Sequence, residues 1–156
     1  MSFNVSQVVN GASQPIPVKG LGYSQVIETF SGAIDRGVES TIVDIKSPIV
    51  IDSLVFSANT DQYIQVRISG YAGTALKALS DTSANGSGLL GFFPKNIVEQ
   101  GSAFFDVLAY DNVNQRYKIK LKQPLTFAEG AKITIRNIAS GTAFNGNVVV
   151  MGRAYE

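Results

Sequence analysis

From residue 23 onward, hydrophobic residues occur in short runs that are separated by turn-forming residues. Apolar and polar positions alternate within these runs, most clearly in 63–68 (YIQVRI) and 117–122 (YKIKLK). A period of two is typical of a β-strand with one buried and one exposed face. The runs that predict strands are residues 24–31, 39–45, 49–57, 62–69, 103–110, 116–122, 132–137 and 146–154, with shorter ones at 89–93 and 125–127.

About eight main strands, with Gly, Asn, Asp, Ser and Pro between them, predict an all-β fold for residues 24–156. Two packed antiparallel sheets, as in a β-sandwich or a single jelly roll, accommodate that number of strands. Residues 103–110 and 116–122 predict a hairpin with a longer loop over 111–115. Only the segment 74–79 (TALKAL) favours a short helical turn.

Residues 1–23 do not share the strand pattern, and we expect them to form an extended N-terminal arm. Pro15 and Pro17 interrupt any period, because proline fixes φ and lacks a hydrogen-bond donor. Two interpretations stay open for this arm. It is either a frayed terminus, or it lies on its own domain or on a neighbouring subunit and buries Ile16 and Val18 there.

The composition excludes most familiar catalytic chemistry. The chain has 156 residues, enough for one ordinary domain, but it contains no cysteine and no histidine. These absences remove thiolate metal sites, Ser-His-Asp triads and the usual general base near neutral pH. Oxygen ligands at Asp106, Asp111, Asn112 and Asn114 leave a calcium site open, although the acidic spacing of an EF-hand is missing. We therefore expect a non-enzymatic protein without a cofactor.

Charge and hydropathy narrow the class of partner. The formal net charge is +1, from 13 basic and 12 acidic residues, so no bulk field attracts nucleic acid or an anionic membrane. The sequence has no signal peptide at its start and no run of the roughly 18 apolar residues that a membrane span needs. We expect no specific nucleic-acid partner and no transmembrane segment.

A row of cations is the first candidate for partner binding. Alternation places Arg116, Lys118, Lys120 and Lys122 on one face of a single strand. Such a row suits phosphate, an acidic protein surface or a carboxylated glycan. The alternative interpretation is an edge strand whose lysines prevent pairing with other chains.

A pair of aromatic residues is the second candidate. Phe92 and Phe93 follow a long Gly/Ser/Asn-rich tract over residues 80–88, which predicts a surface loop. Two large apolar side chains at this place are either tucked beneath the loop or presented to a partner. Both interpretations stay open.

The arm, the weakly charged strands without Cys or His, and the closing strand 147–155 (NVVVMGRAY) resemble features of a known class of proteins. That class is the single jelly-roll or β-sandwich structural proteins of viruses, bacteriophages above all. The segment 116–137 is similar in style to paired strands of their capsid, decoration and spike-associated domains. The resemblance is one of architecture, so it transfers no functional residue by position.

That resemblance implies a non-enzymatic virion structural protein, a capsid or capsid-decoration component that acts through self-assembly. Its partners would be further copies of the chain, as a homo-oligomer, and other virion proteins. Its location would be the virion, assembled in the host cytoplasm. A second function also stays open, a carbohydrate- or receptor-binding module whose ligand lies on the loops 82–93 and 111–115.

Overall fold

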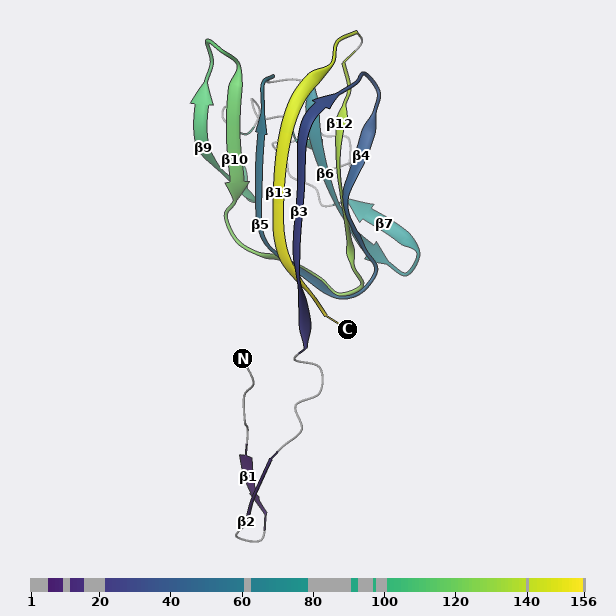
Figure 1. Ribbon diagram of the computed structural model, residues 1–156, viewed down its shortest axis with the longest axis vertical. Helices are drawn as coiled ribbons and strands as arrows, with labels where there is room; N and C mark the ends of the chain where they lie inside the picture. Colours follow the sequence, from purple (N-terminus) through teal and green to yellow (C-terminus); the bar gives the residue numbers. More distant parts are fainter. Residues whose placement is uncertain are drawn as a thin grey trace.

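The computed structural model describes residues 6–9, 12–15, 22–60, 63–78, 91–92, 97, 101–139 and 141–155. Apart from a small N-terminal hairpin, its strands form two antiparallel sheets that pack face to face (Figure 1), which confirms the predicted all-β sandwich. In the described part of the chain, no helix is long and apolar enough to cross a lipid bilayer.

The first sheet has the strand order β3-β13-β5-β10-β9, and β11 pairs with β5 beside this path. Its strands are β3 (Tyr23–Ile34), β5 (Ile49–Ala58), β9 (Phe105–Asp111), β10 (Arg116–Leu121), β11 (Leu125–Phe127) and β13 (Phe144–Tyr155). The second sheet has the order β4-β12-β6-β7, and β8 pairs with β6. Its strands are β4 (Glu39–Ile45), β6 (Ile64–Ala72), β7 (Ala75–Ala78), β8 (Gly91–Phe92) and β12 (Ala131–Asn137).

Strand pairing in the sandwich is nested. The first strand, β3, pairs with the last, β13, and β4 pairs with β12. Further inward, β5 pairs with β10 and β11, and β6 pairs with β7. The strands β13 and β12 then pair with β5 and β6, which joins the nested pairs into the two sheets. This arrangement is that of a single jelly roll, one of the two forms that the sequence left open.

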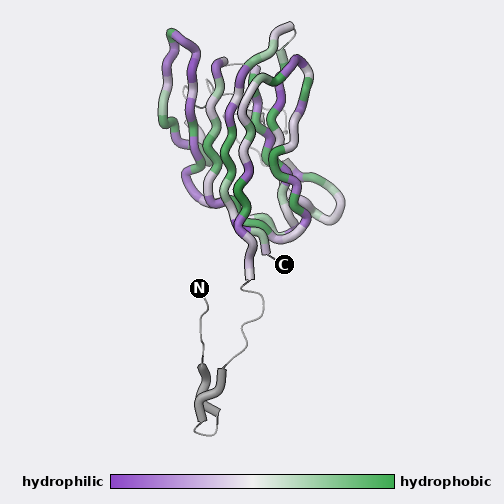
Figure 2. Tube along the Cα trace, in the orientation of Figure 1, coloured by the Kyte–Doolittle hydropathy of each residue, from purple (hydrophilic) through white to green (hydrophobic). Residues whose placement is uncertain are grey.

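The core lies between the sheets and is filled by the inward half of each alternating strand. In β10 and β13 the residues that face the core are buried, and most of those between them are exposed. Figure 2 shows hydrophobic residues recurring along the strands of the sandwich, whereas the tip of the β9–β10 hairpin is mostly hydrophilic. Each large apolar side chain that is fully buried stabilises the fold by roughly 1.5–3 kcal/mol. Fully buried examples are Leu54, Phe56, Ile119, Ile133 and Val148.

The prediction of a helical turn over residues 74–79 is wrong in its described part, because Ala75–Ala78 forms strand β7. Gly73 has a φ of 62° and is the first residue of a two-residue turn that returns the chain along β6. So short a helix gains few hydrogen bonds, whereas the open edge of β6 offers a full ladder. Pairing with β6 therefore overrides the helical preference of Ala and Leu.

The N-terminal arm contains two short strands, β1 (Ser6–Val9) and β2 (Ala12–Pro15), which pair with each other and with neither large sheet. Ile16 and Val18 lie outside the described residues, so their predicted burial stays a prediction. Phe93 also lies outside them, and Phe92 is described only as a backbone position of β8 opposite Val66. The role of this aromatic pair stays a prediction too.

Candidate functional site

The cation row predicted from the sequence follows β10. Arg116, Lys118 and Lys120 are exposed and alternate with three buried residues, and Lys122 is exposed directly after the strand. Their common face is the outer face of the first sheet, which is turned away from the core. The sequence therefore predicted the geometry of the row, and its role in binding stays a prediction.

β10 is not an edge strand. It is hydrogen-bonded to β5 on one side and to β9 on the other, so Tyr117 lies between Ala58 and Tyr110. The interpretation of the lysines as protection for a sheet edge is therefore wrong. The reason is the predicted hairpin, which is confirmed and folds β9 back along the outside of β10.

Asp111 is committed to the turn of this hairpin. Its carboxylate accepts hydrogen bonds from the backbone N–H groups of Val113 and Asn114, each at 3.1 Å, and from Nδ2 of Asn114 at 2.6 Å. The hydrogen bonds from Asn114 lower the pKa of Asp111, and the nearby cation Arg116 lowers it further. These bonds fix the shape of the loop beside the cation row.

The oxygen ligands considered for calcium do not converge. Asp106 and Asp111 lie on the same strand, β9, five residues and about 16 Å apart along it. A calcium ion binds its ligands at about 2.3–2.6 Å, so one ion does not reach both carboxylates. Asp106 instead lies 3.9 Å from Nζ of Lys122.

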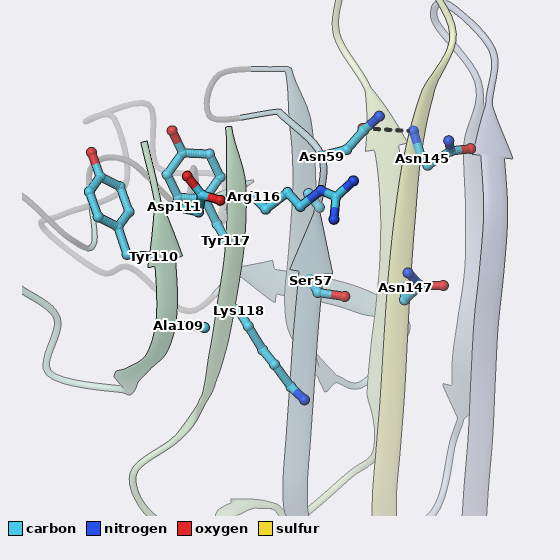
Figure 3. A pocket seen from close by; sticks show the side chains of 11 residues that line it. Ser57, Asn59, Ala109, Tyr110, Asp111, Arg116, Tyr117, Lys118, Asn145 and Asn147 are labelled. Atoms are coloured by element: carbon cyan, nitrogen blue, oxygen red, sulfur yellow. Dashed lines mark hydrogen bonds between the residues drawn. The ribbon is translucent and has the colours of Figure 1, made fainter. Parts of the chain in front are cut away.

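A groove of about 460 Å³ opens on the outer face of the first sheet, beside the β9–β10 turn (Figure 3). We call it the polar groove, because most side chains that line it on this face are polar or charged. They come from β9, from β10, from β5 and the residue after it, and from β13. They are Ser57, Asn59, Ala109, Asp111, Arg116, Lys118, Asn145 and Asn147, and Ala58, Tyr110 and Tyr117 line the groove as well.

Strand register brings these side chains together from distant parts of the chain. Lys118 lies opposite Ser57, and Ser57 lies opposite Asn147 on its other side. Two residues away along each segment, Asn59 and Asn145 also bond to each other. The backbone N–H of Asn145 donates to Oδ1 of Asn59 at 3.0 Å, and the N–H of Asn59 donates to the carbonyl of Asn145 at 3.2 Å. These bonds hold both asparagines at the rim of the groove.

Two tyrosines of the hairpin contribute differently. Tyr110 and Tyr117 lie opposite each other, with ring centroids 5.1 Å apart, and their side chains point away from the asparagines of the groove (Figure 3). The side chains around the asparagines therefore offer charge and hydrogen bonds rather than an aromatic ring.

Asp111 lies opposite Arg116 in register, but its carboxylate already accepts three hydrogen bonds within the turn. Among the described residues, Arg116, Lys118 and Lys120 have no acidic oxygen within 4.0 Å. An exposed cation without a partner is available to an anion from outside.

The outer face of the second sheet carries a cluster of polar and charged groups that bind one another. Glu39 accepts a hydrogen bond from Oγ1 of Thr134 at 2.6 Å and lies 3.3 Å from Nη1 of Arg67. The hydrogen bond from Thr134 is the main cause that lowers the pKa of Glu39, and Arg67 adds to it. Nearby, the hydroxyl of Tyr71 donates to Asp44 at 2.5 Å, which raises the pKa of Tyr71. These groups are therefore engaged with one another or with their neighbours on the sheet.

Comparison with known proteins adds no relative. No protein-family model matches the chain, and no curated protein matches it.

A second surface lies on the same outer face as the polar groove. Ile27, Val149 and Met151 are exposed to 57%, 40% and 40%, and the half-buried Val55 lies beside Val149. Register places Met151 opposite Ile27, so the four side chains form a continuous patch over β3, β13 and β5. We call this patch the apolar band. Reasoning from sequence missed it, since its members alternate with core residues and read as ordinary strand positions.

Proposed function

We propose that the protein is a non-enzymatic virion structural protein, a capsid or capsid-decoration component that acts through self-assembly. The observation that carries the proposal is the apolar band. Contiguous apolar side chains on an exposed sheet face are a typical mark of a protein–protein contact. The partners would be further copies of the chain and other virion proteins.

The fold and the composition support this proposal. Jelly rolls are the architecture of many viral capsid domains, although fold alone does not fix function. Charged residues make up 16% of the chain, below the roughly 25% that is usual, so neighbouring subunits cover its surface with little loss of ion hydration. The strand β3, which borders the apolar band, carries only one charged residue, Glu28.

The test is the mass of the protein in solution and its binding to purified particles. We expect the wild type to form an oligomer or to join particles, and the double variant Ile27→Lys/Met151→Lys to lose both properties. Val113, which is 91% exposed at the hairpin tip, gives the matched control Val113→Lys, which should assemble normally. A wild type that stays strictly monomeric and joins no particle would contradict the proposal.

A second function, recognition of a carbohydrate or receptor, is favoured by the polar groove. The groove lies beside the β9–β10 turn, and loops carried on a rigid sheet are frequent binding sites. A glycan array distinguishes the two functions. Silence across the array together with particle association would leave assembly alone, whereas binding that is lost in Asn147→Ala would support recognition.

A further inference from the structure

We infer that the polar groove binds an acidic saccharide, a sugar whose ring carries a carboxylate or a sulfate. The inference rests on the second proposed function, recognition of a carbohydrate, and adds the chemical class of the ligand. It is independent of assembly through the apolar band.

The first argument is the orientation of the amide groups. A backbone N–H only donates, so the bond from Asn145 fixes Oδ1 of Asn59 toward β13 and leaves the Nδ2 donor exposed. On β13, Oδ1 of Asn147 accepts from the hydroxyl of Ser31 at 2.5 Å. Figure 3 shows Nδ2 of Asn147 on the side of the groove. Both amides therefore present N–H donors to a ligand.

The second argument is charge. Arg116 and Lys118 stand two residues apart on one face of β10, about 7 Å from each other along the strand. Both side chains extend over β5, Arg116 toward Asn59 and Lys118 to a place below Ser57 (Figure 3). The carboxylate of Asp111 also lines the groove but is bound within the turn, so two cations and two amide donors favour a ligand that is rich in acceptor oxygens and negatively charged. The guanidinium of Arg116 suits the two oxygens of a carboxylate or sulfate.

The third argument is size. The donors span the two strand spacings from β10 across β5 to β13, which is about 10 Å. A free phosphate or sulfate ion is too small to reach both the cations and the amides. A sugar ring with an acidic group fills the groove of about 460 Å³, because its hydroxyls also pair with Ser57, which both donates and accepts.

The surface disfavours a nucleic acid as the occupant. A polynucleotide needs an extended basic track and aromatic rings on which bases stack. The net charge is +1, and the two tyrosines that line the groove have their rings turned away from its asparagines. Short acidic saccharides need neither feature.

The test is isothermal titration of the full chain with matched probes: an oligogalacturonate, a sulfated disaccharide, a neutral galactose oligomer and inorganic phosphate. We expect at least one acidic saccharide to bind, and the neutral oligomer and phosphate to bind at least tenfold more weakly. Arg116→Gln and Lys118→Gln should each weaken the acidic saccharide by about tenfold or more, the usual cost of losing a charged hydrogen bond. Lys77→Gln, on β7 of the second sheet, is the control and should bind as the wild type does.

The outcomes separate the two claims. Equal binding of neutral and acidic saccharides would keep carbohydrate recognition and overturn the acidic class. Equal binding of phosphate would show a simple anion site and overturn the saccharide. If none of the probes and no glycan on the array binds, recognition and the inference both fail. Circular dichroism of each variant confirms that its β-structure is intact.

Discussion

Two sites on the outer faces of this sandwich carry similar kinds of residues and use them in opposite ways. On the second sheet, Glu39 is bound by Thr134 and Arg67. In the polar groove of the first sheet, Arg116 and Lys118 have no acidic oxygen within 4.0 Å among the described residues, although the same face holds an ion pair between Arg153 and Asp52.

The difference shows what paired and unpaired polar groups on a sheet face each contribute. Groups that bind one another within a face add to stability, and they resist a partner because the partner must first break those bonds. Groups left unpaired add little stability and stay available for a ligand. The first sheet also exposes the apolar band, so both proposed contacts lie on its outer face.

We expect the largest effect on stability at Gly152 of the first sheet. At this residue, next to Met151 of the apolar band, β13 shifts register against β5. A Cβ atom there would lie 2.5 Å from the carbonyl oxygen of Val50, so the backbone must move. Gly152→Ala should lower the free energy of unfolding by roughly 2–3 kcal/mol in urea titrations. Gly141→Ala is the control, because no atom lies within 4 Å of its Cβ position. Equal stability of the two variants would mean that the first sheet does not depend on this irregularity.

A smaller effect separates the two faces directly. Thr134 is 6% exposed, and Thr134→Val removes its hydrogen bond to Glu39, so we expect a loss of about 1 kcal/mol. Ser57→Ala, at the floor of the polar groove, should change stability by less than about 0.5 kcal/mol. Chemical denaturation of both variants measures the contrast. A greater loss at Ser57 would reverse our view of the two faces.

The contribution of Glu39 to the stability of the second sheet depends on pH. The pKa of Glu39 is lowered in the folded protein, so its ionised form stabilises the fold above the ordinary value of 4.5. That contribution is lost as the pH falls through the lowered pKa. The stability difference between wild type and Glu39→Gln should therefore be largest near neutral pH and vanish in strong acid, as urea titrations at several pH values would show. A difference that grows on acidification would refute this sign.

The smallest effect is expected at Lys118. It has no acidic partner among the described residues, so Lys118→Gln should leave the free energy of unfolding unchanged within about 0.5 kcal/mol. Thermal unfolding checks this. A clear loss of stability would show that the cation row of the first sheet has a structural role after all.

Local patterns in the sequence predicted much of the fold, because alternation is set by which face of a strand is buried. The burial of every second residue in β10 follows directly from 116–121. The strand β7 could not be predicted from its local pattern, because its pairing depends on the open edge of β6 rather than on its own residues.

The candidate site was predictable only in part. The cations of β10 belong to one segment, whereas Asn59 and Asn145 are 86 positions apart. They meet only because β5 and β13 pair in one particular register, and no local pattern specifies that register.

The nested pairing of strands also has a consequence for how the chain folds. The strand β13 lies between β3 and β5 and bonds to both, although it comes last of the three along the chain. While a ribosome is still making the chain, the core-facing residues of β3 and β5 have no strand between them. Closure of the sandwich therefore awaits synthesis of β13, and contacts between such distant segments form slowly. In that interval the exposed apolar residues and unpaired strand edges of the unfinished sheet favour aggregation.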